Sequence, residues 1–92
     1  MREKLQDIAK ADIPGTDYYV QIEKFNRYGA EYEHIHRYNE WDAFILPKDE
    51  TVRRTWELSD LHAGSDREAK ADIEALVKDV FGITGELDWE DL

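Results

Sequence analysis

Between Tyr18 and Leu58 the chain contains three stretches of alternating polar and apolar residues and one apolar run over residues 41–46, and this pattern constrains the fold more than any other feature of the chain. Alternation with a period of two places successive side chains on opposite faces of a β-strand. Strands are predicted over residues 18–28, 31–38, 41–46 and 52–58. Gly29 and residues 39–40 lie at the expected turns. Because short turns join antiparallel neighbours, we expect a meander of three or four antiparallel strands.

The segment between Ser65 and Gly82 has the spacing of an amphipathic helix. Its apolar stripe consists of Ala69, Ile73, Leu76, Val77 and Val80. Ser65 and Glu68 form a capping box at the start, because the first hydroxyl can accept from the backbone N–H three residues later. Gly82 suits a left-handed cap, and Ile83 can make the apolar contact that accompanies it. We therefore predict a long helix that packs across the apolar face of the sheet.

Residues 2–11 also show helical spacing, because Leu5, Ile8 and Ala9 share one stripe with Met1. Pro14 and Gly15 would end this helix. A helix this short is marginal alone and has to dock. The expected fold is thus α+β: a short N-terminal helix, an antiparallel sheet of three or four strands in a meander, a longer C-terminal helix packed on the sheet, and a short acidic tail over residues 84–92.

The chain length of 92 residues favours a single domain covering residues 1–92, and 41% hydrophobic residues are enough for a folded core. The absence of cysteine excludes disulfides and thiolate metal sites. The N-terminal sequence lacks the apolar run of a signal peptide, and no run of eighteen apolar residues occurs. We therefore expect a cytoplasmic protein without membrane contact.

The chain carries 22 acidic and 12 basic residues, a net charge of −10. Residues 1–23 contain five acids and three bases, residues 24–56 six of each, and residues 57–92 eleven acids and three bases. The predicted sheet is locally neutral, so the excess belongs to the long helix and the tail. Such a field opposes approach to phosphates and anionic lipids, whereas it accelerates encounter with a basic partner.

At about 100° per residue, the polar surface of the long helix divides into two flanks. One flank is mixed, with Arg67, Lys70, Glu74 and Lys78, and Glu74 precedes Lys78 at the spacing of a favourable ion pair. The other flank is acidic. Together with the tail it supplies the predicted partner-binding residues: Glu68, Asp72, Asp79, Glu86, Asp88, Trp89, Glu90 and Asp91.

Two alternatives to this binding surface remain open. A charged helix face is often simply solvated. In the tail, Leu87 and Trp89 are either an exposed anchor for a partner, as tryptophan often is at interfaces, or a flap that covers the edge of the core. Removal of residues 85–92 would separate these two roles.

The sequence predicts neither catalysis nor a cofactor. His34 and His36 share a strand face, and His62 with Asp60 could join them around a metal, but alternation brings any such pair together, so no metal site is assigned. No nucleophile elbow or phosphate-binding glycine loop is present. The predicted sheet carries five bases beside tyrosines, namely Lys24, Arg27, Arg37, Arg53 and Arg54. Acidic residues interrupt them, so direct nucleic-acid binding is not expected.

We therefore expect a small acidic protein-binding inhibitor that occupies a basic surface of a partner, such as a nucleic-acid-binding protein or nuclease complex. In size and charge the chain is similar to DNA mimics, including anti-CRISPR proteins, the phage-encoded antagonists of host defence nucleases. That resemblance implies action in the host cytoplasm. The alternative is an accessory or regulatory domain, without mimicry, that docks a partner or forms a homodimer through its aromatic sheet face or its tail.

Overall fold

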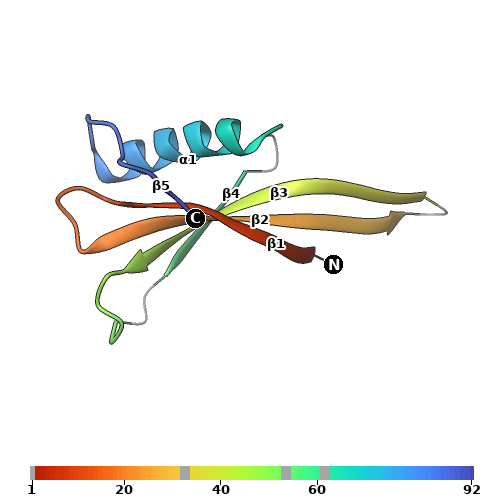
Figure 1. Ribbon diagram of the computed structural model, residues 1–92, viewed down its shortest axis with the longest axis horizontal. Helices are drawn as coiled ribbons and strands as arrows, with labels where there is room; N and C mark the ends of the chain where they lie inside the picture. The colour runs from red at the N-terminus through yellow and green to blue at the C-terminus, as the bar shows by residue number, and fades with distance from the viewer. Residues whose placement is uncertain (1, 32–33, 53–54, 61–62) are drawn as a thin grey trace.

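The computed structural model of the protein describes residues 2–31, 34–52, 55–60 and 63–92. In these ranges the chain forms a five-stranded antiparallel sheet with one α-helix lying over one of its faces (Figure 1). The elements in chain order are β1 (Arg2–Asp12), β2 (Tyr18–Glu31), β3 (His34–Pro47), β4 (Trp56–Asp60), α1 (Asp66–Phe81) and β5 (Glu90–Asp91). The strand order is β4-β3-β2-β1-β5. The predicted α+β class, antiparallel sheet and C-terminal helix are confirmed, whereas the strand count is wrong.

The predicted N-terminal helix is also wrong, because this segment is strand β1, paired antiparallel to β2. The register with β2 shifts twice, between Lys4 and Gln6 and between Asp7 and Ala9. An irregularity of this kind moves the following side chains to the other face of the sheet, so Ile8 and Ala9 are both buried although they are neighbours. The interrupted alternation imitates the apolar spacing of a helix.

Strands β2 and β3 are longer than predicted and pair continuously from Tyr18 opposite Pro47 to Glu31 opposite His34. The expected turns at Gly29 and at residues 39–40 are absent from these paired strands. The two predicted strands over 31–38 and 41–46 are one strand, β3. Unbroken pairing with β2 satisfies the backbone there, which outweighs the local turn preference. The far half of this hairpin extends well beyond the helix (Figure 1).

The core lies between α1 and the sheet. Alternation along β3 directs Trp41, Ala43 and Ile45 toward the helix. The buried apolar cluster consists of Ile8, Ala9, Ala11, Ile13, Val20, Ile22, Trp41, Ala43, Ile45, Ala69, Ile73, Val77 and Leu87. Trp41 also fixes the helix start, because its Nε1 donates to Asp66 Oδ1 at 2.9 Å. Lys24 Nζ lies 3.4 Å from the same oxygen.

Both caps of α1 are as predicted. The backbone N–H of Glu68 donates to Ser65 Oγ at 3.1 Å, and Glu68 Oε2 accepts from the backbone N–H of Gly64 at 2.8 Å. At the other end, Gly82 has φ 66°, the left-handed conformation that favours glycine. Ile83 packs against the core. No helix in the described part of the chain is long and apolar enough to cross a membrane.

The apolar stripe of the helix is only partly buried. Ala69, Ile73 and Val77 are fully buried, whereas Leu76 is 44% and Val80 is 64% exposed. The end of the helix therefore leaves apolar surface in contact with water.

Two valines on α1 provide a matched test of this packing. We predict that Val77→Ala lowers the free energy of unfolding by about 2 kcal/mol, because two buried methyl groups are lost and a cavity is left. Val80→Ala should change it by less than about 0.5 kcal/mol. Urea denaturation followed by circular dichroism measures both. Equal losses would contradict the placement of α1.

Candidate protein-binding surface

The acidic tail, residues 84–92, folds back along the molecule rather than extending from it. Leu87 is buried in the core and Trp89 packs partly buried against it. Strand β5 pairs with β1, with Ala9 opposite Asp91, and the backbone N–H of Leu92 donates to the carbonyl of Ile8 at 3.0 Å. The arrangement is the one expected of a flap that covers the core.

Glu74 holds the tail in this position. Its Oε1 accepts hydrogen bonds from the backbone N–H of Leu87 at 2.9 Å and from Trp89 Nε1 at 3.1 Å. The sequence suggested Lys78 as the partner of Glu74. The tail instead supplies two donors to one carboxylate oxygen, and a carboxylate forms stronger hydrogen bonds than a neutral acceptor.

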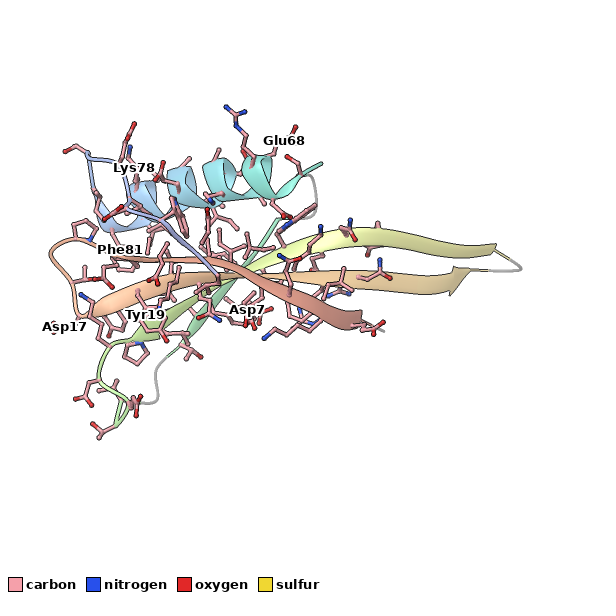
Figure 2. The ribbon with its side chains drawn as sticks, in the orientation of Figure 1. Asp7, Asp17, Tyr19, Glu68, Lys78 and Phe81 are labelled. Atoms are coloured by element: carbon pink, nitrogen blue, oxygen red, sulfur yellow. The ribbon has the colours of Figure 1, made fainter. Side chains whose placement is uncertain are left out.

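The predicted binding residues divide into two separate groups. Glu68, Asp72 and Asp79, hereafter the acidic flank, are all exposed on α1. The tail runs along the opposite flank of the helix, where it meets Lys70 and Glu74. These flanks are about 120–180° apart around the helix axis at 100° per residue. Figure 2 shows Glu68 on the side of the helix that faces away from the sheet.

Two tail carboxylates are partly balanced by lysines. Lys70 Nζ lies 2.8 Å from Asp91 Oδ1, and Lys10 Nζ lies 3.9 Å from Glu90 Oε2. Both carboxylates are largely exposed, so these pairs contribute little to stability. Glu86 and Asp88 are exposed as well. The tail is thus a second acidic surface, distinct from the acidic flank.

The sheet face opposite α1, hereafter the open face, is covered by ion-paired side chains and not by a helix. Arg2 contacts Asp42, and its guanidinium lies 4.1 Å from the centre of the Phe25 ring. Arg27 forms an ion pair with Glu40, as Arg2 does with Asp42. Asp42 and Glu40 are only 0% and 1% exposed. Two carboxylates are therefore buried on this face, each beneath an arginine.

Ion pairs on the open face also shift the pKa values of the side chains that form them. Lys4 Nζ lies 2.8 Å from Asp7 Oδ1 and contacts Glu23 as well. The hydrogen bond from Lys4 lowers the pKa of Asp7, and the bonds to Asp7 and Glu23 raise the pKa of Lys4. The hydrogen bond to Glu40 raises the pKa of Arg27. Charges on this face are thus engaged with one another.

Sequence reasoning missed this network. The sequence predicts a turn at Glu40, and it shows Glu40 and Asp42 as acidic residues that interrupt the bases of the sheet. Their alternation with Trp41 and Ala43 was a usable signal, since it places both carboxylates on the face that the helix does not cover. Arg2 could not be matched to them, because it was assigned to a helix.

An apolar groove lies between β4 and the end of α1, hereafter the edge groove. It is lined by Ile45, Trp56, Leu58, Val80 and Phe81. Trp56 is 42% exposed, although one side of its ring meets Tyr18 edge-on with ring centres 5.2 Å apart. The sequence placed Val80 in the core and gave no sign of this groove.

The suggested histidine site and part of the suggested basic face involve residues or side chains outside the described part of the structure. His62, Arg53 and Arg54 are outside the described residues, and the side chains of His34, His36, Arg37 and Asp60 are not among those described. Among the described residues, no cluster of three acidic or histidine side chains could hold a metal ion. Lys24 and Arg27, the remaining bases of that face, are paired with Asp66 and Glu40.

The tail's attachment can be tested at Glu74. We predict that Glu74→Ala lowers the free energy of unfolding by about 1–3 kcal/mol, because two donors lose their acceptor. In a Trp41→Phe, Trp56→Phe background, the fluorescence of Trp89 should shift to longer wavelength. Glu86→Ala, which removes an exposed carboxylate, is the control. Unchanged emission in Glu74→Ala would contradict this role.

Asp7 provides a pH test. Its carboxyl should titrate below the ordinary value of about 3.9 in a carboxyl-carbon NMR titration, and Lys4→Met should raise the midpoint toward that value. Because the folded pKa is lowered, the associated stability is present above the unfolded pKa and is lost as pH falls through the folded pKa. Lys48→Met, which removes a different pair, should leave Asp7 unchanged. An unmoved midpoint in Lys4→Met would refute the pairing.

Comparisons with known proteins provide no family and no relative. No protein-family model matches the chain, and neither the curated proteins nor the solved structures contain a significant match.

Proposed function

We propose that this protein is a small acidic binding protein that occupies a basic, nucleic-acid-binding surface of a partner and blocks it. The acidic flank of α1 is the primary contact, and the exposed tail carboxylates form a second one. The mechanism is competition, because carboxylates that replace phosphates on a basic surface exclude the nucleic acid sterically and electrostatically.

The observation that carries this proposal is the unequal distribution of charge between the two parts of the chain. In the described structure Lys4, Arg27 and Lys48 pair with acids of residues 1–56. Three bases of this part reach acids of residues 57–92, in the pairs Arg2–Glu57, Lys10–Glu90 and Lys24–Asp66. Residues 57–92 hold eleven acids and three bases. Most of the negative field therefore originates on the helix side of the molecule.

Rigidity also supports binding at the acidic flank. Glu68 is fixed by the capping box, and α1 is anchored by a fully buried row that includes Ile73 and Val77. Carboxylates on an anchored helix keep their spacing, so less conformational entropy is lost on binding than with a free peptide. Trp89, in contrast, is held by Glu74, which favours the helix over the tail as the main contact.

The charge test compares two double variants with the same net charge. Asp72→Lys with Asp79→Lys reverses the acidic flank, whereas Asp17→Lys with Glu50→Lys reverses two exposed loop carboxylates elsewhere. Each protein is immobilised and used to capture partners from its native cell at low and moderate salt. We expect wild type and the loop variant to retain nucleic-acid-binding proteins that duplex DNA elutes.

The flank variant should retain these proteins roughly 30-fold more weakly, since two contacts of about 1 kcal/mol each are lost. Equal retention by both variants, or retention that DNA does not reverse, would refute the proposal. Circular dichroism of each variant verifies that the helix is intact.

A further inference from the structure

The two edges of the sheet differ in how far they are protected against pairing with another strand. On one edge, β1 carries two register irregularities and is partly covered by β5. Irregular, charged or covered edges resist the addition of another strand. On the other edge, no strand of the described ranges pairs with the outer side of β4. Among the described residues, the outer backbone of β4 therefore has no strand partner.

Apolar side chains accompany the open edge. Trp56 and Leu58 lie on the helix side of β4, opposite Ile45 and Ala43 of β3, and they line the edge groove. Val80, 64% exposed, stands on the helix side of that groove. Exposed apolar surface beside an unpaired strand is a typical site for an extended peptide, whose backbone pairs while alternate side chains enter the groove.

Carboxylates surround the groove. Asp72 and Asp79 lie within about 40–60° of Leu76 around the helix axis at 100° per residue. Since the tail covers the opposite flank, this side of α1 faces β4. On the open face, the exposed Glu57 of β4 lies opposite Phe44, and its Oε1 is 3.5 Å from Nη1 of Arg2. An added strand would therefore lie between the carboxylates of the acidic flank and the partly balanced carboxylate of Glu57.

This charge selects the occupant. A second copy of the chain would bring a further net charge of −10 against the same acidic rim, which disfavours a dimer at this edge. A basic segment gains from the same field. The alternation of an added strand requires apolar side chains at every second position, where they enter the edge groove, and allows lysine or arginine between them.

We propose that β4 accepts an extended basic segment of the partner as an additional strand. The segment's alternate apolar residues occupy the edge groove beside Trp56. Its basic residues point to the open face toward Glu57, and the acidic flank contributes to the negative field that attracts the segment. This inference rests on the proposed function and adds the form in which the basic partner is recognised: a strand of alternating basic and apolar residues.

The test uses a capped heptapeptide in which lysine and valine alternate, titrated into the full-length protein and followed by amide NMR. Backbone signals of residues 56–60 and 76–81 should shift. Val80→Ser should weaken binding about tenfold, because burial of one valine side chain corresponds to roughly that factor. Leu5→Ser, which removes a similarly exposed apolar side chain from β1, should leave affinity unchanged.

Two peptide controls separate strand addition from simple charge attraction. A peptide of the same composition with its lysines and valines in separate blocks should bind at least about tenfold more weakly. Of two peptides N-methylated at even or at odd positions, only one should bind, because an added strand pairs along one of its edges.

Equal binding by the alternating and block peptides would overturn strand addition while leaving the acidic-surface proposal intact, since its capture experiment is independent. Absence of β4 shifts would also overturn the inference. Sedimentation provides the last outcome: a dimer of the protein alone that Val80→Ser dissociates would assign the edge to a second copy instead.

Discussion

A sheet has two faces, and the described part of this chain has a single helix with which to cover one of them. The fold depends on how that constraint is met. On one face α1 buries Ile73 and Val77 against the strands. On the other, arginine side chains lie over Phe25 and over two carboxylates that are themselves buried. A charged layer thus takes the position that a second helix would occupy.

This solution carries a risk and a consequence. A buried carboxylate is tolerated only while its partner is present, because removal of one partner leaves an uncompensated charge in a poorly hydrated site. Arg2 and Arg27 are therefore needed where they are. Arg2, Lys4 and Arg27 are engaged on this face, and among the described bases of the sheet Lys10 and Lys24 pair with acids of the tail and the helix. The negative field of the protein is partly a result of how its sheet is closed.

The sequence predicts the helix well because its signals are local. Ser65, Glu68 and Gly82 each act through backbone groups within one turn. The N-terminal strand was missed for the opposite reason: its two register irregularities depend on β2 and erase the period of two. The turn expected at residues 39–40 likewise gave way to a long-range ladder.

The candidate site shows the same contrast between features set by local spacing, which could be predicted, and features set by long-range contacts, which could not. Exposure of Asp72 and Asp79 could be predicted from helical spacing alone. The separation of the acidic flank from the tail could not be predicted in this way. It depends on Glu74 accepting hydrogen bonds from Leu87 and Trp89, which are distant in sequence, and not on the expected pair with Lys78. The edge groove was equally hidden, since only the position of the helix on the sheet decides that Val80 extends beyond cover.

The pairing of β5 with β1 has a consequence for the order of folding. It joins Lys10 with Glu90, two of the most distant parts of the chain, and β1 has no other neighbour on that side among the described strands. Contacts between such remote segments close late, because loop closure must precede them. We therefore expect β1 to pair with β2 first, and its other edge to remain unpaired until β5 of the tail pairs with it.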